Sequence, residues 1–448
     1  MERRSNLFGL SAEARARLIE KLSAPPEHPV EAGRLDPASL AGAREIGMIA
    51  AAADYLGIAD PFFREHDGIA GAETVIDGRR YANFSSYDYL ALNGDTRIAD
   101  AAKAAIDRWG TTVSASRAVS GERELHRELE AALARVHGAE DAMVMVSGHA
   151  TNVSVIGALL GPEDAIVHDA LAHNSIVEGA RLSGARRLAF AHNDPDAADR
   201  VLGEARARHA LIAIEGHYSM DGDRPDLATF VAVARRHRAW LMVDDAHGLG
   251  VLGATGRGSA EYRGVDPKDI DILMGTLSKS LVSSGGYIAG GRKLIEYLKR
   301  RVPGFVFSVG IAPPVAAAAL AALHIIEAEP ERVARLNRHA RLFRDLLREG
   351  GIDTGSSIGA AIVPVITGSS IRAGRLAASL FARSVNVAPI LYPAVPERAA
   401  RLRFFITAGH TEAQLCETAG IVIEESRAVA AEPVDLAAVA RHLRGGSP

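Results

Sequence analysis

The segment Asp271-Ile-Leu-Met-Gly-Thr-Leu-Ser-Lys-Ser-Leu-Val-Ser-Ser-Gly-Gly286 joins an apolar run to a lysine, Lys279, that stands among small and hydroxyl-bearing residues. The apolar run predicts a buried strand, and the residues after it offer hydroxyl and backbone donors to an anion. Burial disfavours the ammonium form of a lysine, so its neutral amine can attack an aldehyde and form an imine. Most lysines that follow a strand are solvated surface residues, and this segment alone leaves both interpretations open.

Seven short apolar runs, one of which lies in this segment, alternate for the most part with helical patterns. Because each run is continuous, both faces of each strand are expected to be covered, as in a largely parallel α/β sheet. In such sheets the ligand binds outside the carboxyl ends of the strands, so the residues after each run are the candidate ligands. The runs are Ala142–Val146, Ala165–Val167, Arg187–Phe190, Ala210–Ile214, Trp240–Val243, Ile270–Met274 and Gly286–Ala289.

The remaining patterns predict an N-terminal attachment, a large α/β domain and a smaller α+β domain. Residues 1–30 are expected to form an appended helix and linker, because a helical pattern there ends in a cluster of prolines. Residues 31–82 include a hairpin whose turn is Asp77-Gly78, and they are expected to join the small domain. Residues 83–312 form the predicted large domain, and residues 313–448 form the predicted small domain. Two helices expected in the large domain are Thr96–Trp109 and Glu122–Val136.

The composition limits the classes of function. A net charge of −4 and a hydrophobic content of 48% are ordinary for a soluble protein, and no long basic stripe suggests a nucleic-acid ligand. The single cysteine, Cys416, excludes an internal disulfide and a cysteine-cluster metal site. No run reaches the roughly 18 apolar residues of a membrane helix, and the start of the chain carries no signal pattern. We therefore expect a cytoplasmic protein that spans no membrane.

Several small polar residues follow the predicted strands. Ser147-Gly148-His149 opens a helix whose first N–H groups suit a phosphate, although a plain strand-to-helix turn has the same pattern. A Walker loop is excluded, because no Gly-Lys-Ser/Thr follows. After later strands, His173 could stack on a flat heteroaromatic ring and Ser219 could donate to a phenolate-like oxygen. Both positions are also compatible with ordinary surface loops.

Asp244 emerges from a buried strand, where a carboxylate is costly unless a cation partners it. A protonated pyridine nitrogen would be such a cation, and keeping it protonated turns the ring into an electron sink. His247 could then reach the ring oxygen or the substrate. The alternatives are a structural ion pair or a metal pair, and a metal is disfavoured because no third ligand follows at regular spacing. In the small domain, Arg403 could grip a substrate carboxylate with two parallel hydrogen bonds.

Together these residues resemble the α-oxoamine synthases among the fold-type I pyridoxal-phosphate enzymes, which include 8-amino-7-oxononanoate synthase, 2-amino-3-ketobutyrate CoA ligase, 5-aminolevulinate synthase and serine palmitoyltransferase. The resemblance covers roughly Pro61 to Glu424, with the motifs in the family's order. It implies a large domain with a mostly parallel seven-stranded sheet, a smaller α+β domain, and a homodimer with active sites at its interface. In chain order the motifs are Asn83-Phe-Ser-Ser-Tyr-Asp-Tyr-Leu, Ser116-Arg-Ala-Val-Ser-Gly, Leu125-His-Arg-Glu-Leu-Glu130, Ser147-Gly148, Asp169-Ala-Leu-Ala-His173, Tyr218-Ser-Met-Asp-Gly-Asp223, Val243-Asp-Asp-Ala-His-Gly248, Thr276-Leu-Ser-Lys279, Phe305-Val-Phe-Ser308 and Arg401-Leu-Arg403.

The resemblance also implies a role for each candidate residue around pyridoxal 5′-phosphate. Lys279 would bind the cofactor as an imine, Asp244 would pair with the pyridine nitrogen, and His173 would stack on the ring. His247 and Ser219 would lie near the phenolic oxygen. Gly148, His149 and Thr276 would hold the phosphate, together with Ser308 from the partner subunit. Arg403 would bind the amino-acid carboxylate, and Tyr87 is assigned to the substrate. No metal is implied.

The implied reaction is the decarboxylative condensation of a small amino acid with an acyl thioester, which yields an α-aminoketone, CO2 and a free thiol. Lys279 would also take the Cα proton of the amino acid, and Gly, Ala and Ser all remain open as that substrate. An aminotransferase or an aldolase-like lyase would use the same Lys279 and Asp244. A catalytically silent cofactor-binding regulator or scaffold is a more distant alternative.

The chain departs from the family's pattern at three places. Ser114-Ala-Ser-Arg117 stands where many members have Ser-Gly-Gly-Ser-Arg, and Gly121-Glu122 replaces a common Gly-Thr. His149 stands where many have an aromatic residue after Ser-Gly. The segment that begins at Ile390 lacks the arginine of the oxononanoate synthases, which argues against a pimeloyl substrate. With the appended N-terminal helix, these departures suggest a secondary-metabolism member whose acyl group is held by a carrier protein instead of CoA.

Overall fold

The computed structural model describes residues 36–432, 438–439 and 442. The chain divides into two compact units: Met1–Asp60 with Pro433–Pro448, and Pro61–Glu432. In the first unit, the described elements include the 3-10 helix η2 (Pro37–Ser39) and helix α2 (Ala41–Tyr55), and the ring of Tyr55 stacks on that of His442 at 4.7 Å. The helix and linker predicted for residues 1–30 lie outside the described residues.

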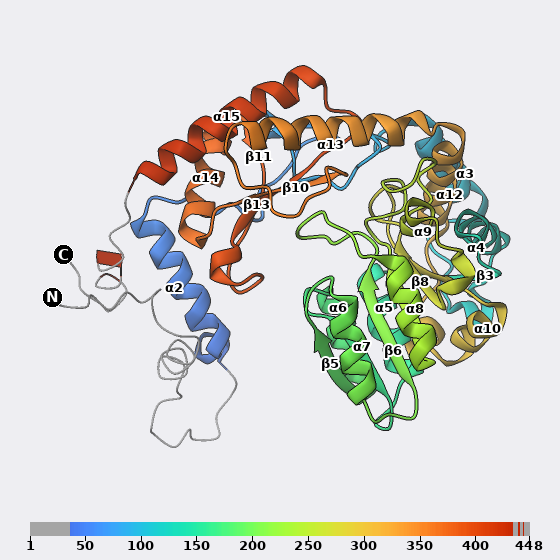
Figure 1. Ribbon diagram of the computed structural model, residues 1–448. Helices are drawn as coiled ribbons and strands as arrows, with labels where there is room; N and C mark the ends of the chain where they lie inside the picture. The colour runs from blue at the N-terminus through green and yellow to red at the C-terminus, as the bar shows by residue number, and fades with distance from the viewer. Residues whose placement is uncertain (1–35, 433–437, 440–441, 443–448) are drawn as a thin grey trace. The chain divides into compact units, whose positions relative to one another are not determined.

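The second unit contains the predicted seven-stranded sheet (Figure 1), in the order β3-β9-β8-β7-β6-β4-β5. Only β9 runs antiparallel to its neighbours, which are β3 and β8. The prediction of a largely parallel sheet is therefore confirmed, and each of the seven apolar runs contributes one strand. The strands are β3 (Asp141–Met145), β4 (Ala165–Asp169), β5 (Arg186–Phe190), β6 (Ala210–Glu215), β7 (Trp240–Asp244), β8 (Ile272–Thr276) and β9 (Gly286–Gly290).

Helices cover both faces of this sheet. Successive side chains of a strand point to opposite faces, so one strand contributes side chains to both buried clusters. In β3, Met143 and Met145 belong to one buried cluster while Ala142 and Val144 belong to the other. This double burial explains why the inner strands are mostly apolar, whereas the edge strand β5 begins with the exposed Arg186 and Arg187 and buries only Phe190, so the expectation that both faces of every strand are covered is wrong there. On the Met143 face lie α5 (Gly148–Leu159), α6 (Asn174–Ser183) and α10 (Arg292–Arg301). On the other face lie α4 (Glu124–His137), α7 (Pro195–Glu204), α8 (Leu227–His237) and α12 (Pro313–Ala328).

The predicted helices of the large domain are confirmed with small shifts at their ends. Helix α3 spans Thr96–Trp109, and Asp95 caps it by accepting from the backbone N–H of Arg97. The apolar stripe of α4, which includes Leu129 and Leu133, is fully buried. Shorter elements connect these helices: η3 (Arg117–Gly121), α9 (Ser259–Arg263), η4 (Pro267–Asp269) and α11 (Pro303–Val306).

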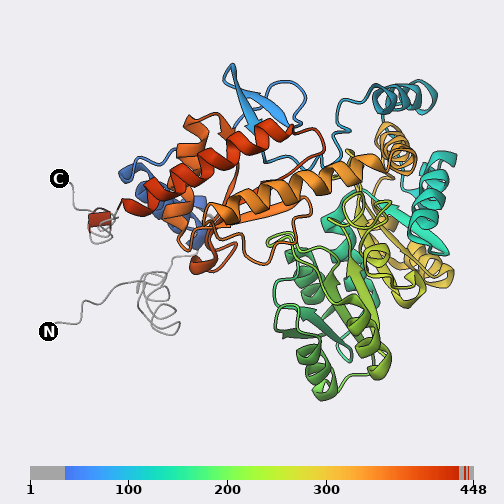
Figure 2. The ribbon, with the colours of Figure 1, turned by 45° about the horizontal axis from the view of Figure 1, so that its top comes forward.

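Outside the seven-stranded sheet, the second unit contains two three-stranded sheets, in the orders β1-β2-β11 and β10-β13-β12. The hairpin turn lies where expected, with Asp77 and Gly78 both at positive φ. Helices α13 and α15 run side by side (Figure 2). The elements are β1 (Glu73–Ile76), β2 (Arg79–Asn83), β10 (Ile362–Ile366), β11 (Val385–Asn386), β12 (Pro389–Ile390), β13 (Arg401–Phe405), η5 (Glu397–Ala399), α13 (Glu331–Glu349), α14 (Ser370–Ala382) and α15 (Glu412–Ala431).

Strand β2 pairs with β11, a strand that lies about 300 positions later in the chain. The segment that precedes the seven-stranded sheet in the chain is thereby joined to a strand that follows it. Along the described parts of the chain, no helix is both long and apolar enough to cross a bilayer.

Candidate active site

A cavity of about 190 Å³ lies at the carboxyl ends of β6, β7 and β8, the edge at which an α/β sheet binds its ligand. Strand β7 ends in Asp244, strand β8 ends in Thr276, and Lys279 follows β8 by three residues. The cavity brings together seven of the residues singled out from the sequence. These are Gly148, His149, His173, Asp244, His247, Thr276 and Lys279.

Lys279 also borders a second cavity of about 410 Å³, which Asn83, Ser85 and Tyr87 line. Its Nζ lies 5.6 Å from the centroid of the Tyr87 ring. The lysine therefore faces one recess deep in the sheet edge and a second that opens toward β2. A ligand in the first recess and a substrate in the second could both reach the same amine.

The surroundings of Lys279 favour a neutral amine more than bulk water does. Burial lowers the pKa of the Lys279 ammonium, the nearby charge of Arg403 acts in the same direction, and Asp244 and Glu215 oppose them. The loop that carries the lysine closes on itself, since the N–H of Leu277 donates to the carbonyl of Gly285 at 3.0 Å. Val282 in this loop has φ of 40°, a strained conformation for a β-branched residue.

A chain of hydrogen bonds links His173 to Asp244. His173 Nδ1 lies 2.7 Å from Ser175 Oγ, and the Nδ2 group of Asn152 donates to Ser175 Oγ at 2.9 Å and to Asp244 Oδ2 at 2.7 Å. The backbone N–H of Ala246 donates to the other oxygen of Asp244 at 3.1 Å. These bonds fix the carboxylate of Asp244, while His173 is exposed at the mouth of the cavity.

Sequence analysis missed two buried residues of the cavity, Asn152 and Glu215. Asn152 lies four residues after Gly148, and this helical spacing places both on one face of α5. Glu215 ends strand β6 as Asp244 ends β7, and the two are partners in the parallel register. Burial, and then the charge of Asp244, raise the pKa of Glu215 to about 8. The signal for Glu215 was a carboxylate at the end of an apolar run.

The start of α5 forms the opposite end of the cavity. Gly148 and His149 are its first residues, so their N–H groups have no partner within the helix. A Cβ on Gly148 would lie 3.0 Å from Thr276 Oγ1, and a Cβ on Gly286 would lie 2.6 Å from the Cα of Gly148. The two glycines therefore let the helix start close to β8 and β9, beside the hydroxyl of Thr276, which itself donates to the carbonyl of Gly285 at 2.8 Å.

His247 lies beside Lys279 on the wall of the cavity and is 7% exposed. Burial, and then the charges of Lys279 and Arg403, hold the pKa of His247 well below its usual range. Its Nδ1 lies 2.7 Å from the hydroxyl of the fully buried Tyr89. His247 is therefore a neutral imidazole with a fixed orientation.

Arg403 and Ser219 lie beside the cavity and do not line it. The Nη1 group of Arg403, in β13, donates to the carbonyl of Ser219 at 2.9 Å, and the guanidinium lies 4.6 Å from the centroid of the Phe405 ring. Ser308 lines neither recess, and its hydroxyl donates to the carbonyl of Val309 at 3.3 Å. Its assignment to the active site of a partner subunit stays a prediction.

The chemistry of this cavity fits the pyridoxal phosphate that the resemblance implies. Three of the buried polar atoms that have no partner among the described residues lie in or beside the cavity: Asn152 Oδ1, Glu215 Oε1 and Arg403 Nε. Such atoms are costly unless a ligand satisfies them. Asp244 suits a ring nitrogen, His173 suits a ring face, and the start of α5 suits a phosphate. In the described part of the chain, no group of three His, Cys, Asp or Glu could hold a metal ion.

A second network holds the loop that carries Ser219. His192 contacts Asp169 at 2.9 Å and Asp223 at 3.0 Å, and the hydroxyl of Tyr218 donates to Asp169 at 2.8 Å. Burial lowers the pKa of His192, but the hydrogen bonds to the two carboxylates outweigh it and raise that pKa to about 10. The imidazolium thus joins the end of β4 to the loop after β6.

We expect this ion pair to make stability depend on pH. The pKa of His192 is about 10 in the folded state and about 6.5 when unfolded, so its stabilisation is complete below pH 6.5 and is lost as the pH rises through 10. His192→Gln should therefore lower the thermal midpoint most at pH 6 and least at pH 10. The exposed His209 offers the matched control, His209→Gln. A His192→Gln deficit that stays constant from pH 6 to pH 10 would contradict the assignment.

Comparison with known proteins places this site in context. A family model for aminotransferases of class I and II matches residues 79–421. The 8-amino-7-oxononanoate synthase of Geobacter sulfurreducens is 44% identical over 352 residues, which cover 78% of this chain and 89% of that protein. The same enzyme of Thermosipho melanesiensis is 40% identical over 355 residues, 79% of this chain and 90% of that protein. Serine palmitoyltransferase of Sphingomonas wittichii superposes with a TM-score of 0.84 at 30% identity, over 89% of this chain and 100% of that chain.

Proposed function

Because the chain belongs to the α-oxoamine synthases, within the class I and II aminotransferase family, we propose that it condenses a small amino acid with an acyl thioester. The reaction releases CO2 and the free thiol and leaves an α-aminoketone. The protein is a pyridoxal-phosphate-dependent enzyme. The observation that carries the proposal is one cavity in which Lys279, a lysine whose pKa is lowered, faces Asp244 and unpartnered polar atoms.

When bound, pyridoxal phosphate supplies an aromatic ring that withdraws electron density from the Cα of the amino acid. Lys279 would anchor the cofactor, and its neutral Nζ would take the Cα proton of the amino acid. Asp244 would keep the ring nitrogen protonated through its negative charge. His173 would hold the face of the ring, and the neutral His247 would orient the ring oxygen or the incoming thioester.

The phosphate is assigned to the start of α5. The free N–H groups of Gly148 and His149 point where an anion is stabilised by the helix dipole, and the Thr276 hydroxyl lies beside them.

Arg403 is proposed to bind the carboxylate of the amino acid. Its Nη1 is engaged by Ser219, whereas its Nε is buried without a partner among the described residues, so the guanidinium has a donor left for a second acceptor. Its packing on Phe405 fixes the plane of the guanidinium. The substrate carboxylate would then be held while the Cα bond that must break is presented to Lys279.

We expect Arg403→Gln to raise the KM for the amino acid about 10- to 100-fold, because a charge-assisted hydrogen bond contributes about 1.5–3 kcal/mol. The KM of Arg403→Lys should lie between those of the wild type and Arg403→Gln, because lysine keeps the charge but lacks the planar guanidinium. The measurement is initial rate against amino-acid concentration at saturating thioester. A fall in kcat with an unchanged KM would place Arg403 in a different role.

A homodimer is part of the proposal, with the Ser308 of one chain completing the site of the other. Two large apolar side chains near Ser308 support it: Phe307 is 86% exposed, and Val119, in the neighbouring η3, is 84% exposed. Exposed apolar side chains that lie together are typical of an interaction surface. Analytical ultracentrifugation of the full chain would decide between a monomer and a dimer.

The reaction is tested with the purified protein, saturating pyridoxal phosphate, a panel of Gly, Ala and Ser, and acyl donors on CoA and on a carrier protein. Release of thiol and CO2 in equal amounts supports the condensation. Formation of a keto acid without thiol release would indicate an aminotransferase, and cleavage of a β-hydroxy amino acid without a thioester would indicate a lyase. Comparison of the two donors decides whether the acyl group arrives on CoA or on a carrier protein.

A further inference from the structure

A cavity of about 510 Å³ lies at the opposite edge of the seven-stranded sheet from Lys279, where β6 and β7 begin. Its floor is apolar, and it includes Leu211 and Trp240, which are partners in the parallel register, and Leu294 from α10. The Trp240 side chain is 44% exposed, and no other aromatic ring or cation of the described residues packs on its indole. A large apolar surface is thus open to solvent inside a recess.

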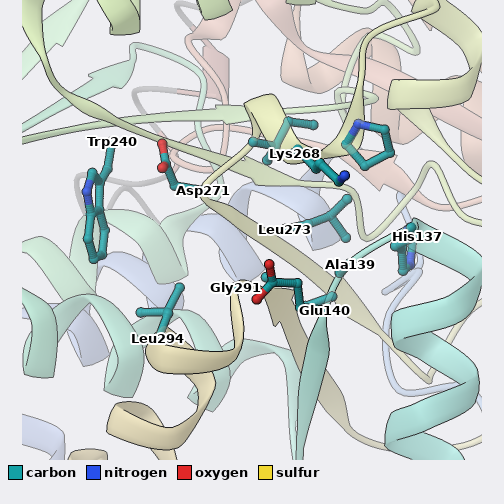
Figure 3. A pocket seen from close by; sticks show the side chains of 14 residues that line it. His137, Ala139, Glu140, Trp240, Lys268, Asp271, Leu273, Gly291 and Leu294 are labelled. Carbon is teal, nitrogen blue, oxygen red and sulfur yellow. The ribbon is translucent and has the colours of Figure 1, made fainter.

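A smaller cavity of about 240 Å³ adjoins this one (Figure 3). Trp240 and Leu294 lie together at one end of it, opposite His137, and both residues also line the larger cavity. The carboxylates of the smaller cavity are already engaged, since Glu140 accepts from the N–H of Arg292 at 2.9 Å and Asp271 accepts from the N–H of Leu241 at 2.8 Å. The two recesses therefore meet over apolar side chains.

The rim of the larger cavity is positively charged. His209, Arg238 and Lys293 line it, and none of its lining residues is acidic. Within the described residues, no carboxylate lies within ion-pair distance of these three side chains, and Asp164 near His209 is held by Arg208 at 3.2 Å. Lys293 stands in the first turn of α10, where the helix dipole favours an anion over a cation.

We propose that this cavity binds one amphiphilic carboxylate, a free fatty acid. The carboxylate lies between Arg238 and Lys293, and the hydrocarbon chain lies on Trp240 and Leu294, apolar side chains of the recess that solvent reaches. Charge on the rim and apolar surface on the floor together fit a single-chain anion. This inference does not depend on the proposed reaction.

The test uses the intrinsic fluorescence of Trp240. The chain has two tryptophans, so Trp109→Phe leaves Trp240 as the reporter in the full-length protein. Dodecanoate, titrated below its micelle concentration, should change the emission in a saturable way. Arg238→Gln with Lys293→Gln should weaken the apparent affinity at least tenfold, whereas Lys268→Gln, an exposed lysine of the neighbouring cavity, should leave it unchanged.

Two further ligands separate charge from hydrophobicity. Dodecanol and dodecyltrimethylammonium should bind at least tenfold more weakly than dodecanoate, because neither offers a carboxylate to Arg238 and Lys293. Equal responses to all three, or no saturable response to dodecanoate, would overturn the proposal. A response to anionic lipid vesicles but not to dodecanoate would also overturn it and would point to a membrane surface. Circular dichroism of each variant confirms that the comparison is made between folded proteins.

Discussion

Lys279→Ala is expected to reduce the rate of condensation at least about 10³-fold, because it removes both the covalent anchor and the group that accepts the Cα proton. A positioned acid or base alone contributes about 10²- to 10⁴-fold. Thiol release from amino acid and thioester measures the loss, and the visible absorbance of the bound cofactor should change with it. Stability should be little affected, since burial of the Lys279 ammonium is unfavourable and the substitution removes it.

The control for this substitution is Lys268→Ala, which changes an exposed lysine on η4 and should retain near wild-type activity. A second measurement distinguishes chemistry from structure. If Lys279 acts through its amine, ethylamine added to the alanine variant should restore part of the proton transfer. A variant that keeps more than a tenth of the wild-type rate would remove Lys279 from the centre of the mechanism.

Asp244→Asn is expected to lower kcat by about 10²- to 10⁴-fold at saturating cofactor, since it replaces the one charge placed to keep the ring nitrogen protonated. The substitution also breaks a hydrogen bond. Asn152 and Ala246 each donate to one oxygen of Asp244, and in the asparagine variant one of these donors would face an NH2 group. With Asp244 neutral, an anion that raises the pKa of Lys279 is removed, so that pKa should fall further.

The measurement is kcat against cofactor concentration, which separates weakened binding from weakened chemistry. Asp271→Asn is a matched control, because Asp271 also accepts a backbone N–H beside a strand but lies at the opposite edge of the sheet. That variant should keep its kcat. If Asp244→Asn loses only cofactor affinity and recovers full kcat at saturation, the proposed electronic role of the carboxylate is wrong.

The strands and most helices followed from local patterns. Continuous apolar runs such as Ala165–Val167 are buried on both faces, and the Asp77-Gly78 turn adopts the positive φ that the dipeptide tolerates. These features depend on residues close together in the chain, where spacing and side-chain type determine the outcome. The pairing of β2 with β11 was beyond such reasoning, because the two strands lie about 300 residues apart and β11 has only two residues.

Some residues of the candidate site could be predicted from the sequence, and others could not. A lysine after a strand and a carboxylate at the end of another stand out in the sequence, and the structure brings Lys279 and Asp244 to one cavity. Asn152 does not stand out, since an asparagine inside a helix is most often solvated. It became part of the site only when α5 and β7 were packed together, which places its amide 2.7 Å from Asp244.

By itself, the sequence determined the class of fold, the family and the residue types available for chemistry, because burial patterns and ordered motifs are written in consecutive residues. Only the tertiary structure decided which of these groups share an environment. The raised pKa of Glu215, the lowered pKa of Lys279 and the orientation of His247 all arise from burial beside charges that lie far away in sequence. A pKa depends on distance and solvation in three dimensions, so Lys279 became more than a lysine after a strand only when the sheet edge around it was formed.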